Sequence, residues 1–294
     1  MTLISNMSLI SKTNARVADF VHWGADAQGS TRPLGLMRIA IATIVFVRFA
    51  NEVSLYQGAS LSFVLLGLAF FGLTSMMLVG CMAQAACAGV ALTLMTMHFY
   101  MGHISGYPGW ASHHIYILIV SVSLLALSPC GRSFSWDRYR ALAQARDARD
   151  IPPEYGDLWP QRLIALQLAA LYFWAAVDKT NWSFLSGERL EQAFTWSYTG
   201  RALEPLISLG AILPVLAIVV VVVEYFLAFA IFVRRWQAFV LPIGLALHAA
   251  FYVLLPVNTY SATVMVLYLA LLDPDAVHRF LDRIQGHGHS PHYL

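Results

Sequence analysis

The chain has 294 residues, of which 59% are hydrophobic and 12% are charged, with a formal net charge of +2. Soluble globular domains carry about 25% charged residues, so this composition, with a mean hydropathy of +0.63, indicates a multi-span membrane protein. The small net charge argues against a nucleic-acid partner, and three cysteines without a CxxC pair predict neither a disulfide framework nor a zinc site.

The N-terminal segment, residues 1–30, is predicted to lie in the cytoplasm or on the membrane surface. It lacks the apolar core and the Ala-x-Ala cleavage site of a removable signal peptide, so none is expected. Residues 15–23 have the pattern of a short amphipathic interfacial helix. At the other end, residues 276–294 are predicted to be a cytoplasmic tail that contains histidines. Such a flexible tail is weak evidence for metal binding, and we assign no metal site.

Eight apolar runs lie between these ends. Each is long enough for a helix that crosses the bilayer or is sheltered inside a bundle. They cover residues 34–54, 61–80, 84–101, 114–130, 161–180, 211–233, 237–256 and 259–273. The sequence therefore predicts an all-α, polytopic integral membrane helix bundle of about eight transmembrane helices, with one domain over residues 31–275.

Basic residues predict the orientation of this bundle. With the N-terminus inside, thirteen lysines and arginines fall in cytoplasmic segments, and only Arg189 and Arg201 fall in external loops. This bias predicts that both termini are cytoplasmic. The longest cytoplasmic connection, residues 131–160, is expected to be part interfacial helix and part loop. Residues 181–210 are rich in aromatic side chains and are expected to form an external cap.

Lys179 is one of only two lysines, and it lies near the end of an otherwise apolar run. A helical rise of about 1.5 Å per residue places it near the outer edge of the hydrocarbon layer. The side chain could therefore snorkel to water. Alternatively, its amine is kept partly neutral in a lipid-level pocket and acts as a general base.

Other polar side chains are predicted at a similar height, so that polar groups converge on the outer leaflet. They are Arg48, His98, His103, His113 and His114. For Arg48, an ion pair with Glu52 four residues later is the simpler explanation. Arg38 lies near the inner boundary and is expected to snorkel.

Glu224 and His248 are predicted to lie deeper, near the membrane midplane, on neighbouring helices. An unpaired carboxylate is unfavourable there, so Glu224 is expected to pair with His248 or with an arginine, or to be protonated. Two interpretations remain open. The pair could be a hydrogen bond that fixes helix packing, or it could belong to a proton relay or a substrate site.

The pattern Tyr172-Phe-x-Ala-x-Val-x-Lys179, followed by Gly187, resembles the signature helix of the horizontally transferred transmembrane domain (HTTM) family. That family includes the membrane domain of vitamin K-dependent gamma-glutamyl carboxylase. The segment from Trp110 to His113 and His114 is similar to the family's Asn-His segment, and the apolar run that contains Arg38 is similar to its first helix. The resemblance covers most of residues 30–275.

This resemblance implies a membrane enzyme in which Lys179 is the catalytic base. His114 would polarise the substrate or stabilise its anion, and His113 stands where the family has asparagine. The candidate substrate-binding residues are Tyr172, Trp110, Arg48, His98, Glu224 and His248. The resemblance also implies a quinol or vitamin K-like lipid, or a secreted peptide, at an outward-facing site in a bacterial inner membrane. Glutamate carboxylation is not expected, because 294 residues leave no room for the carboxylase's large lumenal region.

Three classes of function remain open at this point. The first is a membrane enzyme that uses Lys179 as a base. The second is a transporter or membrane chaperone with a polar site at Glu224 and His248, and the third is a structural partner protein. An apolar pocket that joins Lys179 to His114 would favour the enzyme, whereas a water-lined path across the level of Glu224 would favour transport.

Overall fold

The computed structural model describes most of the chain. The described residues are 27–53, 60–104, 113–201 and 212–285, with the single positions 18, 21, 24, 204 and 210, and without the side chains of 113, 114, 148 and 234. Most of the expected interfacial helix at residues 15–23 lies outside the described residues. The histidines at the end of the tail, in residues 286–294, also lie outside them.

Each of the eight predicted apolar runs contains a helix. They are α2 (Arg32–Phe49), α3 (Leu61–Val79), α4 (Ala83–Met97) with the π-helical turn η1 (His98–Ile104), α5 (His113–Ala126), α7 (Trp159–Lys179), α10 (Leu213–Ala230), α11 (Gln237–Leu254), and α12 (Asn258–Leu267) with the 3₁₀ turn η6 (Tyr268–Leu271). In the described residues, four helices are long and apolar enough to cross a membrane: α3, α4 with η1, α10 and α11. The bent pair formed by α12 with η6 and the helix that follows would be a fifth. The protein is thus a mostly helical membrane protein, and the total of eight transmembrane helices stays a prediction.

Shorter elements connect these helices. They are β1 (Gln28–Ser30), α6 (Trp136–Gln144), η3 (Ala148–Asp150), β2 (Tyr155–Asp157), α8 (Trp182–Leu185), α9 (Glu188–Tyr198), η5 (Arg234–Trp236) and α13 (Pro274–Ile284). The connection 131–160 contains the expected short helix, α6. It also contains β2, which pairs antiparallel with β1 so that Gly29 lies opposite Gly156. The sequence does not predict this ribbon, because three-residue strands are too short to show an alternating pattern.

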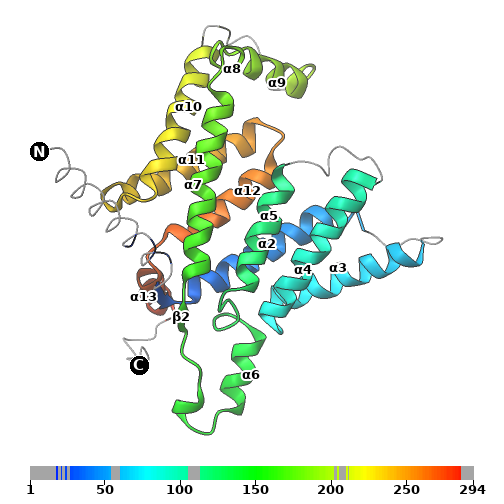
Figure 1. Ribbon diagram of the computed structural model, residues 1–294, viewed down its shortest axis with the longest axis vertical. Helices are drawn as coiled ribbons and strands as arrows, with labels where there is room; N and C mark the ends of the chain where they lie inside the picture. The colour runs from blue at the N-terminus through cyan, green and yellow to red at the C-terminus, as the bar shows by residue number, and fades with distance from the viewer. Residues whose placement is uncertain are drawn as a thin grey trace, which may run out of the picture.

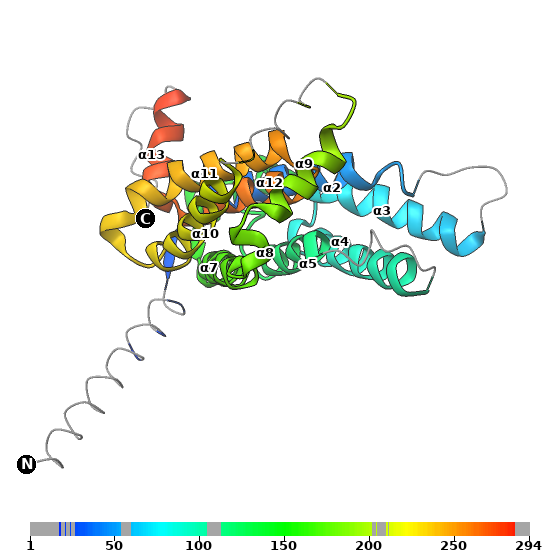
Figure 2. The same cartoon turned by 90° about the horizontal axis from the view of Figure 1, so that it is seen from above.

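The helices are arranged in two rows. Figure 2 shows α2, α11 and α12 in one row and α4, α5 and α7 in the other. In Figure 1, α10 lies along α7, in agreement with their extensive contacts. The short helices α8 and α9 lie at one end of α7, and α6 and β2 lie at the other (Figure 1). The two ends of α7 therefore face different surroundings.

Helix α7 begins at Trp159-Pro160, and a proline in the first turn suits a helix start because its nitrogen needs no intrahelical acceptor. Its buried face repeats every three or four residues and includes Tyr172 and Ala176. Lys179 is three residues beyond Ala176 and so lies on the same stripe. The signature lysine is therefore on the side of α7 that packs into the bundle.

The expected snorkelling of Arg38 is wrong. Instead of snorkelling, its side chain is completely buried, and it donates a hydrogen bond of 2.6 Å to the carbonyl oxygen of Phe134. Gly80 makes room for it, because a Cβ atom at that position would lie 1.8 Å from Nη1 of Arg38. The turn before α6 covers this end of α2, a contact between distant segments that the depth estimate did not include.

A group of polar residues, here called the Arg32 clasp, joins the start of α2 to β1, β2 and α13. The clasp consists of Ser30, Arg32, Glu154, His278 and Asp282. Arg32 forms ion pairs of 3.0 Å with Glu154 and 2.7 Å with Asp282. The Nδ1 atom of His278 lies 2.8 Å from Oγ of Ser30. Burial, and next the nearby charge of Arg32, lower the pKa of His278 below its ordinary value.

Candidate functional site

Lys179 lies in the last turn of α7, but its amine turns back along the helix. Nζ donates to the carbonyl oxygen of Ala175 at 3.3 Å and to the two carboxylate oxygens of Glu224 at 3.0 and 3.1 Å. Side chains of a helix tilt toward its N-terminus, so a long lysine reaches about one turn back from its own Cα. The side chain does not snorkel past the end of α7.

Glu224 comes from the middle of α10, and only 3% of its side chain is exposed. Its partner is Lys179, so the expected pairing with His248 or with an arginine is wrong. The depth estimate placed Lys179 well above Glu224 because it counted backbone positions alone. The backward reach of the lysine and the packing of α10 along α7 bring the two charges together.

His248 belongs to a different hydrogen-bonded group. Its Nε2 atom lies 2.7 Å from the hydroxyl of Tyr172, which lies 2.7 Å from the hydroxyl of Tyr268. Gly244, one turn before His248, leaves space for this group, since a Cβ atom there would lie 1.6 Å from the hydroxyl oxygen of Tyr268. These buried contacts fix α7 against α11 and η6.

Two tyrosines beside His248 were not among the predicted site residues: Tyr268, and Tyr260, whose ring centroid is 5.6 Å from that of His248. A signal was present in the sequence. The two tyrosines are eight residues apart in an apolar run, a spacing that keeps both within one buried stripe of a helix. A search for polar atoms with helical spacing would have found them.

A cavity of about 750 Å³ opens beside Lys179. Its walls come from α5, α7, α8, α9, α10, α11 and α12 and the residues after α11. The lining residues are Tyr116, Ile117, Val120, Gln167, Ala170, Leu171, Trp174, Ala175, Asp178, Lys179, Phe184, Leu190, Val220, Phe251, Leu255, Val257 and Tyr260. The Lys179 side chain is 24% exposed, whereas Glu224 does not line the cavity. Lys179 therefore forms part of the cavity wall, whereas its partner Glu224 does not.

The lining is mostly apolar, and its polar side chains include Gln167, Asp178, Lys179 and the two tyrosines Tyr116 and Tyr260. Such a cavity suits a lipophilic molecule that carries one polar or acidic group, because apolar walls favour its body and polar groups orient it. Among the described residues, no group of three histidine, cysteine, aspartate or glutamate side chains is placed to hold a metal ion.

The predicted histidines whose side chains the structure describes do not line the cavity. Nε2 of His98 lies 3.0 Å from the hydroxyl of Tyr116. His98 therefore contacts a residue of the cavity wall but does not line the cavity itself. His113 and His114 begin α5, close in sequence to Tyr116, but their side chains are outside the described part of the structure, as is the whole of Trp110.

Arg48 forms the ion pair with Glu52 that its spacing predicts, at 3.0 Å, and it does not line the cavity. The side chains of the pair are 42% and 35% exposed, so they are partly open to their surroundings. The structure thus gives Arg48 a local partner and places it apart from Lys179.

The structure explains why the residue at position 187, the glycine of the signature, is a glycine. Its φ of +84° favours glycine, and a Cβ atom would lie 2.8 Å from the backbone nitrogen of Pro214. The turn between α8 and α9 can therefore sit directly on the start of α10. This contact places Phe184 and Leu190 over the cavity.

A comparison with known protein families identifies the family of this chain. The family model of the HTTM domain matches residues 43–275, which is more than half of the chain. No curated protein and no solved structure matches this chain. The match contains Lys179, Glu224 and every residue that lines the cavity. The chain therefore belongs to the HTTM family, of which a resemblance to the membrane domain of vitamin K-dependent gamma-glutamyl carboxylase is a general property.

Proposed function

We propose that the protein is a membrane enzyme in which Lys179 acts as a general base on a lipophilic quinol bound in the cavity. The observation that carries this proposal is Lys179 in the wall of a mostly apolar cavity of about 750 Å³, with its amine hydrogen-bonded to Glu224. A secreted peptide with an acidic group is an alternative substrate for the same base.

The residues that line the cavity support a flat, apolar substrate. Trp174 and Phe251 contribute aromatic surface to the walls, and Ala170 and Ala175 leave space along α7. A quinol has an apolar body for these surfaces and a hydroxyl group for Lys179. The small and aromatic residues therefore bind the ring, and the polar edge of the cavity orients its O–H bond.

The ion pair provides a route to a basic amine. In a low-dielectric site, the proton of the pair can move from Lys179 to Glu224, which leaves a neutral amine toward the cavity and a neutral carboxyl group behind it. The amine then takes the proton of the quinol hydroxyl. The products are an ammonium group at Lys179 and a quinolate anion, whose opposite charges stabilise each other.

Tyr172, His248 and Tyr268 serve as positioning residues in this scheme. Their hydrogen bonds join α7 to α11 and η6 about two turns before Lys179. A base must be held within about 0.5 Å of its productive position, and a buried polar group of this kind restricts movement of α7. His114 is proposed to stabilise the anion, by family resemblance, and His113 to stand beside it.

The proposed topology places this site toward the outside of the membrane. We infer eight spans with both termini in the cytoplasm of a bacterium, because eight apolar runs form helices and the basic residues are concentrated on one side. The Lys179 end of α7 then faces outward in the inner membrane. A lipid-soluble quinol could reach the cavity from the bilayer, and a secreted peptide could reach it from the outer side.

The test compares three purified proteins: the wild type, Lys179→Met, and Thr180→Val as a neighbouring control. The readout is the rate of oxygen uptake with menadiol and with menaquinol-4, after subtraction of the spontaneous rate. Loss of a general base lowers a rate by about 10²- to 10⁴-fold. We expect Lys179→Met to fall to the spontaneous rate and Thr180→Val to resemble the wild type.

Binding is measured in parallel by mass spectrometry of the lipids that purify with each protein. We expect the wild type and Lys179→Met to carry the same quinone, because the apolar walls are unchanged. A Lys179→Met protein as active as the wild type would disprove the role of the lysine. A wild type that neither binds a quinone nor accelerates oxygen uptake would disprove the quinol as substrate.

A further inference from the structure

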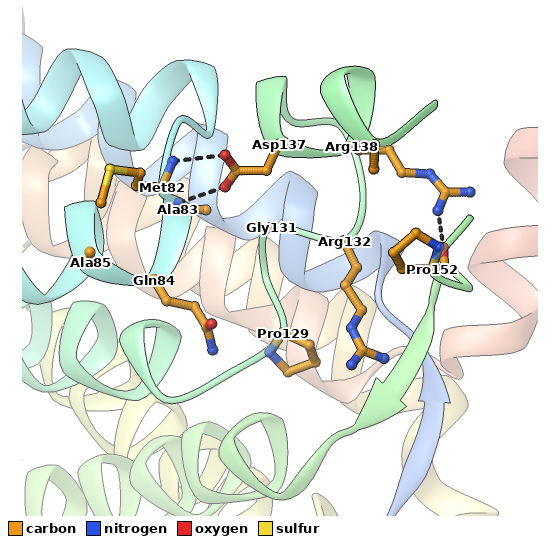
Figure 3. Close-up of a pocket in the computed structure, with 11 residues that line it drawn as sticks. Met82, Ala83, Gln84, Ala85, Pro129, Gly131, Arg132, Asp137, Arg138 and Pro152 are labelled. Carbon is orange, nitrogen blue, oxygen red and sulfur yellow. Dashed lines mark hydrogen bonds between the residues drawn. The ribbon is translucent and has the colours of Figure 1, made fainter. Parts of the chain in front are cut away.

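A second cavity, of about 580 Å³, lies at the opposite end of the bundle from Lys179. It is formed by the start of α4, the turn before α6, the first half of α6 and Pro152, as Figure 3 shows. The proposed enzymatic function does not use it. Its polar lining differs from the apolar cavity, because two arginines, Arg132 and Arg138, are among its residues.

Each of the two arginines donates a hydrogen bond to a backbone carbonyl group. Arg132 donates to the carbonyl oxygen of Tyr155, and Arg138 donates to that of Pro152. In the described part of the chain, neither forms an ion pair with a carboxylate. Each guanidinium group has five N–H donors, so one bond to a carbonyl leaves donors for another acceptor.

Asp137, the acidic residue of this cavity, is engaged elsewhere. Its two carboxylate oxygens accept hydrogen bonds of 2.9 Å from the backbone nitrogens of Met82 and Ala83, at the start of α4 (Figure 3). This cap satisfies the first amides of the helix and directs the negative charge toward them. The two arginines therefore give the rest of the cavity a positive character.

Helix α6 places this cavity beside an interfacial surface. Arg138 and Ala141, three residues apart, line the cavity. Trp136 and Tyr139 have the same spacing on another face, with 45% and 60% of their surfaces exposed and their rings stacked at 5.1 Å. Exposed tryptophan and tyrosine side chains on an amphipathic helix are typical of the level of lipid headgroups.

We propose that this cavity binds the phosphate group of an anionic phospholipid. Guanidinium groups bind phosphate oxygens through pairs of parallel hydrogen bonds, and Arg132 and Arg138 approach the cavity from two neighbouring segments. Trp136 and Tyr139, on another face of α6, would hold this helix at the level of the lipid headgroups. The bound headgroup joins α6 to the segment around Pro152 and so holds the connection 131–160 against the bundle.

The test uses the full chain in detergent and measures its binding of dioleoyl phosphatidylglycerol by native mass spectrometry, with dioleoyl phosphatidylcholine as the neutral lipid. The variant is Arg132→Gln/Arg138→Gln. The matched control is Arg140→Gln/Arg149→Gln, which removes the same charge from two exposed arginines that do not line the cavity. We expect the first variant to bind phosphatidylglycerol at least about tenfold more weakly, and the control to change by less than about twofold.

Equal losses in the two variants would overturn the proposal, because they would show a general attraction between charges. Inorganic phosphate that displaces the lipid, and binds as tightly as the lipid does, would overturn it in favour of a free anion. If the glutamine variant does not fold, Arg132→Lys/Arg138→Lys replaces it. This variant keeps the charge and loses the paired hydrogen bonds, so we expect weaker binding of phosphatidylglycerol there as well.

Discussion

Two groups of buried charges lie near opposite ends of the bundle, and they differ in what surrounds them (Figure 1). In the Arg32 clasp, one cation is bound by Glu154 and Asp282, and its guanidinium group also donates to a backbone carbonyl of α13. In the second group, Lys179 has one acidic partner, Glu224, and the lysine lines a cavity. The clasp joins segments, whereas the lysine pair leaves a reactive group accessible.

This comparison shows that burial of a charge does not by itself indicate a site. The Arg32 side chain is 10% exposed and Lys179 is 24% exposed, but the more important difference is what lies beside each cation. Donors of both cations point at protein acceptors. Lys179, however, also lines a cavity in which a substrate could take the place of one of these acceptors.

The largest predicted effect concerns the lysine pair. Glu224→Leu leaves the Lys179 ammonium without its partner, and breaking a buried pair in this way costs about 3–5 kcal/mol of stability. The double variant Lys179→Met/Glu224→Leu removes both charges and is expected to regain most of that loss. The free energy of unfolding is compared by thermal unfolding in detergent, with a maleimide dye that reacts with the buried Cys87 and Cys130 as they become exposed.

The double variant should nevertheless be inactive, since it has no base. A double variant that is as unstable as Glu224→Leu would mean that the site needs the charges for its structure. It would then resemble the clasp, and the distinction between the two regions would be lost.

A smaller effect is expected in the clasp. Arg32→Met leaves Glu154 and Asp282 without their common partner, but these carboxylates are 17% and 22% exposed and retain some contact with water. We expect a loss of about 1–3 kcal/mol in the same unfolding assay. The control is Arg283→Met, an exposed arginine in the last turn of α13. Similar stability of the two variants would show that the clasp contributes little.

The smallest effect is a pH dependence of the clasp. Burial lowers the pKa of His278 in the folded protein, so the unfolded chain binds its proton more readily. The stabilisation is complete above the unfolded pKa of about 6.5 and is lost as the pH falls from there toward the folded pKa. The unfolding temperature of the wild type, measured from pH 7.5 to pH 5, should therefore decrease more than that of His278→Gln. Parallel curves for the two proteins would contradict this assignment.

The sequence predicted the features that depend on residues close together in the chain. Apolar runs predicted eight helices, and the isolated Lys179 with the glycine at position 187 indicated the segment that carries the candidate site. It was not informative about the ribbon of β1 and β2. It was wrong about Arg38, because the turn that covers this arginine is almost a hundred residues away in the chain.

The sequence by itself determined that this protein is a helical membrane protein with a lysine in an unfavourable position, because hydrophobicity and helical periodicity act over neighbouring residues. Only the tertiary structure decided the partner of that lysine. Glu224 is 45 residues away, and it meets Lys179 because α10 packs along α7 and the lysine reaches back by one turn. The cavity beside them also exists only in three dimensions, since its walls come from seven helices.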